Sequence, residues 1–159
     1  PIPATYATMQ IVDGVYTHFV ERDDPLHGEG RLKFELSRMK EILDNCSRRS
    51  LIIVDEPCGG TDPVEGQEQS SRFIKAMIET GAKNLFTTHY HGLPVLVGLN
   101  GYVRNIHPEV YVNGNGDLEY TYKMIEGPAG SSYAEAVARS MGLTGDKLLE
   151  IAKIARNRK

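Results

Sequence analysis

Cysteine is scarce in this chain, and no apolar run is long enough to cross a membrane. Cys46 and Cys58 have neither the spacing of a zinc site nor the density of a secreted disulfide scaffold, which favours a reducing compartment. A membrane helix needs about 20 apolar residues, and the start of the chain lacks the basic and apolar regions of a signal peptide. We therefore expect a cytoplasmic protein with no membrane partner.

Positive charge is not in excess either, because the formal net charge of the 159 residues is -3. A protein without an overall positive field binds nucleic acid through a local patch or through another part of a larger protein. The length and the hydrophobic content of 40% suit one compact domain with an ordinary core. The composition by itself does not indicate DNA binding.

The loop G-x-x-x-x-G-K-[ST], whose backbone N–H groups and lysine hold nucleotide phosphates, is also missing. The segment from Gly142 to Lys147 contains glycines and a lysine but has the wrong spacing. The chain begins Pro1-Ile2-Pro3, without a methionine, and continues directly into strand-like sequence. We expect it to be a fragment of a longer protein.

The first half of the chain has the hydrophobic patterns of alternating strands and helices. Clustered Ile, Val and aromatic residues indicate strands, whereas apolar residues at i, i+3 and i+7 indicate one face of a helix. The predicted elements are two short strands within residues 5–20, a helix over 33–45, a strand buried on both faces at 51–54, a helix that ends at Gly81, and a strand over 84–88. This order predicts parallel strands joined by crossovers, and therefore an α/β sheet flanked by helices.

The second half has the pattern of a β-hairpin followed by helices. A short helix is predicted over residues 93–99, a hairpin from 103–112 and 118–125, and two helices within 132–159 that separate near 142–145. The last turns of this tail are basic, which suits a solvated face or the carboxyl end of a helix and also suits contact with a phosphate backbone.

Two acidic residues follow the apolar run 51–54. In such an arrangement, Asp55 can hold Mg²⁺ and the neighbouring Glu56 can orient an attacking water. The alternative is a solvated acidic turn, which an isolated Asp-Glu pair would favour. A Gly-Thr-Asp-Pro turn at 60–63, then a helix, then a strand ending in Thr87-Thr88-His89 make the first interpretation much more specific.

These segments, in this order, resemble those of ABC-class ATPases, and their residues resemble the MutS family of DNA-repair ATPases over essentially the whole chain. The matching segments are Ile11 to Thr17 (opening strands), Leu51 to Glu56 (Walker B), Gly60 to Gly66 (D-loop), Thr87 to Tyr90 (switch), and Gly130 to Ala138 (the helix after the hairpin). The D-loop residues are more similar to the MutS-like branch that often works outside mismatch repair. The resemblance implies a partial P-loop ABC-class α/β fold with ATP and Mg²⁺ as cofactors.

The resemblance also implies roles for single residues. Asp55 would hold Mg²⁺, Glu56 would act on the attacking water, and His89 would contact the γ-phosphate. The D-loop residues Gly60, Thr61 and Asp62 would lie beside the nucleotide.

The loop 23–34 would be the signature segment of the family, which reaches across a dimer to ATP on the other subunit. Gly30 and Arg31 match its pattern and are candidate nucleotide-binding residues. Leu32 and Lys33 stand where the family usually carries a small polar pair, so the sequence departs from the family pattern at the contact across the dimer. Lys33 would either supply a cation there or remain a solvated charge in the first turn of a helix.

The resemblance predicts how this chain fits into a larger protein. The missing phosphate loop would lie upstream of Pro1, residues 1–131 would form the C-terminal part of the ATPase domain, and 132–159 would form a helical tail that dimerises. The intact protein would be a homodimeric ATPase that binds double-stranded or structured DNA through regions outside this segment. The fragment alone is expected to be inactive.

Several alternatives remain open. His89 and His91 suit part of a metal site, although a third ligand of suitable spacing is not evident. Cys58 is a turn residue or a nucleophile, and sequence names no partner that would activate it. The chain as a whole is alternatively a nucleotide-independent dimerisation module, or part of another ABC-class chromosome-maintenance ATPase.

Overall fold

The computed structural model describes residues 5–19, 30–98, 101–114, 117–130 and 133–157. They divide into two compact units, Pro1–Tyr102 and Val103–Lys159, rather than the single unit expected from the length. Length limits how large a core can grow, but it does not say how many contact-dense units the chain forms. The predicted boundary between residues 131 and 132 falls outside the described residues and stays a prediction.

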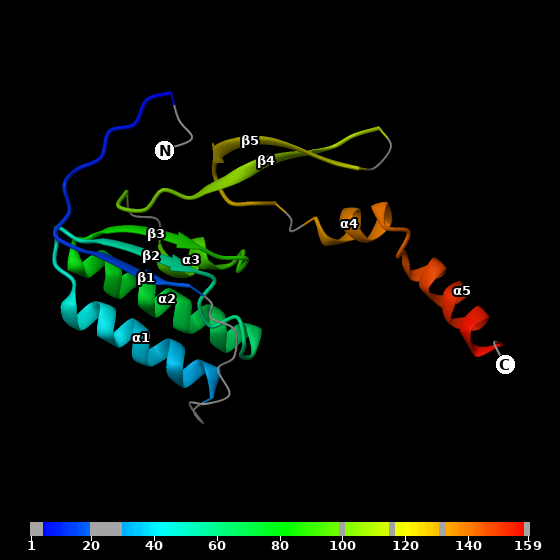
Figure 1. Ribbon diagram of the computed structural model, residues 1–159, viewed down its shortest axis with the longest axis horizontal. Coiled ribbons are helices and arrows are strands. Elements are labelled where there is room, and N and C mark those ends of the chain that lie inside the picture. The colour runs from blue at the N-terminus through cyan, green and yellow to red at the C-terminus, as the bar shows by residue number, and fades with distance from the viewer. Residues whose placement is uncertain (1–4, 20–29, 99–100, 115–116, 131–132, 158–159) are drawn as a thin grey trace. The chain divides into compact units, whose positions relative to one another are not determined.

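The first unit is built on a parallel sheet of three strands in the order β1-β2-β3. Its strands are β1 (Val15–His18), β2 (Leu51–Asp55) and β3 (Lys83–Thr87). The connections run through α1 (Arg31–Asn45) and α2 (Pro63–Thr80), which lie on the same face of the sheet (Figure 1). Two right-handed crossovers that step in the same direction place their helices on one face, and the predicted α/β fold with parallel strands is confirmed.

The core of this unit lies between β2 and the two helices. Met39, Ile42, Ile52, Val54 and Met77 are all buried there. Residues that alternate with them along the strands point to the other face, where the side chain of Leu85 is 57% exposed. On β2 itself, Ile52 and Val54 face α1 and α2 and are buried, whereas Leu51 and Ile53 on the other face are half-buried. Within the described residues, the predicted burial of β2 on both faces is therefore complete on one face and partial on the other.

The segment before β1 also differs from the prediction of two strands. Within the described residues 5–19, β1 is the sole strand, and Tyr6, Met9 and Ile11 have largely exposed side chains. Strand propensity reflects packing on a pleated surface, so a β-rich segment without a pairing neighbour does not become a strand.

The ends of α2 follow from local chemistry. The Asp62 carboxylate accepts hydrogen bonds from the backbone N–H groups of Val64 (2.9 Å) and Glu65 (3.3 Å), and Pro63 occupies the first turn. Gly81 ends the helix in a left-handed conformation with φ +70°, as predicted. The turn at 60–63 is thereby fixed at one end to a regular helix.

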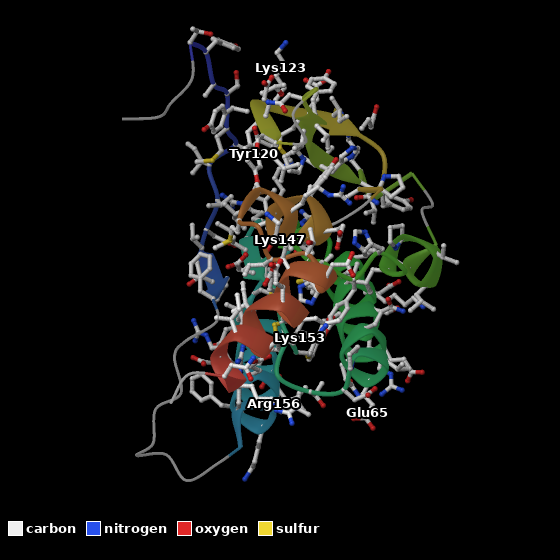
Figure 2. All side chains as sticks on the ribbon, turned by 90° about the vertical axis from the view of Figure 1, so that its right-hand side faces the viewer. Glu65, Tyr120, Lys123, Lys147, Lys153 and Arg156 are labelled. Carbon is white, nitrogen blue, oxygen red and sulfur yellow. The ribbon has the colours of Figure 1, made fainter. Side chains whose placement is uncertain are left out.

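The remaining elements agree with the predicted pattern. A short helix, α3 (Leu93–Val97), ends the first unit, and the second contains an antiparallel hairpin of β4 (Ile106–Val112) and β5 (Leu118–Glu126). Two helices follow, α4 (Ala134–Ser140) and α5 (Gly145–Arg156). Figure 2 shows the basic side chains of α5, among them Lys147, Lys153 and Arg156. In the part of the chain that is described, no helix has the length and apolar character needed to span a bilayer.

Candidate active site

The candidate site lies where β2 and β3 end. Because these strands are parallel, their carboxyl ends meet at one edge of the sheet, and Asp55 pairs in register with Thr87. The Thr87 hydroxyl donates a hydrogen bond to Oδ1 of Asp55. This bond orients a half-buried carboxylate at the edge of the sheet where ligands bind in open α/β folds.

Glu56 is the first residue after β2, and His89 is the second residue after β3, so both lie at the same edge of the sheet as Asp55. The backbone N–H of Glu56 donates to the carbonyl of Thr87 at 3.1 Å, which continues the pairing beyond the strand. Nδ1 of His89 lies 3.6 Å from Oε1 of Glu56, and both side chains are about half exposed. That separation is longer than a direct hydrogen bond and suits two groups that share a bridging water.

The turn after the acids is held by residues from two other segments. The backbone N–H of Cys58 donates to Oε2 of Glu35, a buried carboxylate on α1. The Cys58 carbonyl accepts from the hydroxyl of Tyr90, which follows His89, at 3.0 Å. Both polar groups of one residue in the turn are therefore satisfied by side chains distant in sequence.

Burial sets the chemistry of Cys58. Desolvation, with the Glu35 carboxylate as the second cause, raises the pKa of the Cys58 thiol to about 11. Desolvation also raises the pKa of the Tyr90 hydroxyl above its ordinary value. The thiolate is the nucleophilic form of cysteine, and this raised pKa keeps the Cys58 thiol protonated at neutral pH. Of the two alternatives for Cys58, the structure therefore favours a turn residue over a nucleophile.

The signature and D-loop candidates meet beside this turn. Gly30 is the residue before α1, and the Arg31 side chain lies so close to Gly60 that a Cβ there would stand 3.0 Å from Cδ of Arg31. Nε of Arg31 donates to Oε1 of Glu35 at 2.9 Å. Thr61 is half-buried in the D-loop, while the loop before Gly30 lies outside the described residues.

Comparison with known proteins identifies the family to which this chain belongs. The family model described as MutS domain V matches residues 1–158. The chain belongs to the MutS family. The DNA mismatch repair protein MutS of Lactobacillus gasseri is 34% identical over 94% of this chain, and its namesake in Lactococcus lactis is 34% identical over 96%. That of Shouchella clausii is 35% identical over 89%.

The MutS assignment confirms the family predicted from sequence, and the mixed α/β fold is that of the MutS ATPase domain. The chain covers only 17% of the Lactobacillus gasseri protein and 18% of the Lactococcus lactis one. It therefore spans less than a fifth of the length of these relatives. The greater similarity to the branch outside mismatch repair stays a prediction.

The structure adds residues of the MutS segment to which sequence reasoning assigned no role. The sequence places Thr87 and Tyr90 in the segment that resembles the switch but gives neither a role of its own, and it gives none to Glu35. Glu35 shares its helix face with the buried Met39 and Ile42 at i, i+4 and i+7, which is the signal that would have revealed it. A carboxylate on a buried stripe needs a partner, and Arg31 at i-4 is one.

The alternative metal site has a simple geometric test. Among the described residues, no three His, Cys, Asp or Glu side chains gather closely enough to hold a metal ion by themselves. His89 instead contacts the ring of Tyr90, with ring centroids 4.7 Å apart.

Proposed function

We propose that this chain is the C-terminal part of the ATPase domain of a longer MutS-family protein, which couples ATP hydrolysis to the processing of mismatched or structured DNA. One observation carries the proposal: Asp55, Glu56 and His89 converge at the carboxyl edge of adjacent parallel strands. Family membership adds the expectation of a nucleotide at this edge.

The residues at this edge suit Mg²⁺. The ion prefers oxygen ligands, and it is commonly bound by one or two carboxylates together with water and substrate phosphates. Asp55 offers such a carboxylate, oriented by the Thr87 hydroxyl. When bound with ATP, the ion would neutralise charge on the phosphates.

Glu56 and His89 have different tasks in this proposal. The half-exposed Glu56 carboxylate would accept a hydrogen bond from the attacking water and so orient it for hydrolysis. The His89 imidazole, 3.6 Å away, would donate a hydrogen bond to a γ-phosphate oxygen. Because both side chains reach solvent, a water and a phosphate can approach them.

The signature and D-loop residues would act across a homodimer. Gly30 and Arg31 would face ATP held by the second subunit, and the D-loop residues Gly60, Thr61 and Asp62 would lie at the junction between them. The Arg31 side chain already rests against Gly60, so these two segments are adjacent within one subunit. DNA would be bound by regions outside this chain, in a cytoplasmic protein.

The test of this proposal is ATP hydrolysis by the full-length protein carrying Glu56→Gln. Glutamine keeps the shape of the side chain but is a poor proton acceptor, so turnover is expected to fall by about a hundredfold or more. Glu68→Gln is the matched control, because Glu68 is an exposed residue of α2 whose carboxylate lies 3.7 Å from the Arg72 guanidinium on the surface of the helix. An unchanged turnover for Glu56→Gln would refute the assigned role.

A second candidate function is dimerisation without nucleotide. Helix α5 exposes apolar side chains, and Leu148, Leu149, Ile151 and Ile154 are each between 48% and 64% exposed. An apolar stripe of this kind suits burial against a second subunit. Sedimentation of the chain at several concentrations, with and without Mg-ATP, tests this: dimers that ignore nucleotide, together with a full-length protein that does not hydrolyse ATP, would favour the second candidate.

A further inference from the structure

The backbone directly after the acids has an unusual conformation. Glu56 and Cys58 have φ values of +43° and +62°, in the left-handed region that residues other than glycine rarely adopt. Such conformations persist only where surrounding contacts hold them. The direction of the Glu56 side chain therefore depends on what secures this turn.

Two side chains hold this turn by binding the backbone N–H and the backbone carbonyl of Cys58. Glu35 accepts from the N–H of Cys58, and Tyr90 donates to its carbonyl. Glu35 is 4% exposed, and burying a carboxylate is costly unless hydrogen bonds compensate it. Both of its oxygens are used, because Oε1 accepts from Nε of Arg31.

Space around Tyr90 is arranged for the same contact. Gly66, in the first turns of α2, is buried against the Tyr90 hydroxyl. A Cβ at this position would stand 2.4 Å from Oη of Tyr90 and 2.8 Å from the carbonyl oxygen of Cys58. The absence of a side chain at Gly66 is what lets the hydroxyl reach the turn.

The two side chains come from the segments that the proposed function places against nucleotide. Glu35 is bound to Arg31, the first residue of α1, which lies against Gly60. Tyr90 follows His89 and contacts its ring. A movement of either segment is therefore transmitted to the backbone of Cys58, two residues from the Glu56 carboxylate.

We propose that Glu35 and Tyr90 are positioning residues that hold the Glu56–Cys58 turn and thereby couple the signature and switch segments to the water-orienting carboxylate. This inference rests on the proposed ATPase function. In this role Glu35 and Tyr90 contact the backbone of Cys58 and act on hydrolysis through Glu56. Their loss should slow the hydrolytic step and leave nucleotide affinity almost unchanged.

The test uses the full-length protein with Glu35→Gln and, separately, Tyr90→Phe. Glutamine has one acceptor oxygen, so it cannot accept from both Arg31 and Cys58, and phenylalanine removes the hydroxyl alone. The single-turnover hydrolysis rate at saturating ATP is expected to fall on the order of tenfold in each, because a small displacement of a catalytic group is costly. The KM for ATP should change less than about twofold.

Matched controls lie on the same elements or carry the same change. Glu41→Gln removes a carboxylate from α1 that pairs with Arg38 at 2.7 Å on the surface, and Tyr102→Phe removes a hydroxyl from a side chain that is 83% exposed. Both are expected to hydrolyse ATP at the rate of the unmodified protein. If Glu35→Gln does not fold, Tyr90→Phe still tests the inference.

The decisive arm combines each change with Glu56→Gln. If Glu35 and Tyr90 act through Glu56, the double variants should be no slower than Glu56→Gln alone. The inference is overturned, while the proposed function stands, if Glu56→Gln is slow but the Glu35 and Tyr90 variants keep the full rate, or if the losses multiply. If Glu56→Gln itself keeps the full rate, the proposed function fails and this inference fails with it.

Discussion

Replacing Gly66 tests how tightly the first turns of α2 pack against Tyr90 and Cys58. Replacing a glycine by alanine inside a helix ordinarily stabilises a protein by about 1 kcal/mol. At Gly66, however, the added Cβ would stand 2.4 Å from Oη of Tyr90 and 2.8 Å from the Cys58 carbonyl oxygen, and one of these atoms belongs to the backbone. The turn or the tyrosine must therefore shift.

The size of the effect follows from three contributions. Overpacking of this kind costs about 1–3 kcal/mol, and displacing Tyr90 loses a hydrogen bond worth about 1 kcal/mol. Against these stands the gain of about 1 kcal/mol in helix propensity. We expect Gly66→Ala to lower the free energy of unfolding by about 2 kcal/mol, measured by urea denaturation followed by circular dichroism.

Two comparisons make this prediction specific. Gly145→Ala adds the same methyl group to a helical glycine with nothing within 4 Å, and it should leave stability unchanged or slightly higher. In a Tyr90→Phe background, the penalty of Gly66→Ala should shrink, because the nearest obstructing atom is gone. Equal or greater stability of Gly66→Ala in the otherwise unmodified protein would refute the packing argument.

Two further predictions concern the same turn and the helix after it. Because burial raises the pKa of Cys58 to about 11, iodoacetamide at pH 8 should modify Cys46 well before Cys58, as mass spectrometry would show; equal rates would contradict the burial. The pKa of Cys58 in the folded protein lies above its ordinary value of 9.0, so folding favours the protonated thiol. The stability that the buried thiol contributes is therefore complete below pH 9 and is lost as pH rises through 11. Cys58→Ala should remove this pH dependence of the free energy of unfolding. Asp62→Ala should lower the free energy of unfolding by about 1 kcal/mol through loss of the α2 cap, and a change below a few tenths would show that the cap is unimportant.

The parts of the fold that follow from local pattern were predictable. The Asp62 cap and the Gly81 stop define α2 from residues close in sequence, and the apolar run of β2 places Asp55 at its end. The edge of the sheet follows because consecutive βαβ units pair in parallel. The convergence of Asp55 with the end of β3 was therefore accessible from sequence.

The remaining features depend on contacts between distant segments. Whether residues 5–13 become a strand depends on a pairing neighbour, and whether β2 is covered on both faces depends on where both crossovers pass. The hydrogen bonds to Cys58 come from distant parts of the sequence, because Glu35 is 23 positions before it and Tyr90 is 32 positions after it. Hydrophobic periodicity carries no information about such pairs, so these contacts emerge only from the structure.

The most direct test of the central claim is a crystal structure of the full-length protein with Mg²⁺ and a non-hydrolysable ATP analogue. The account predicts that the Asp55 carboxylate lies at the metal ion, with Glu56 and His89 facing the γ-phosphate from the carboxyl edge of β2 and β3. A nucleotide bound away from this edge, with Glu56 and His89 exposed to solvent, would contradict it.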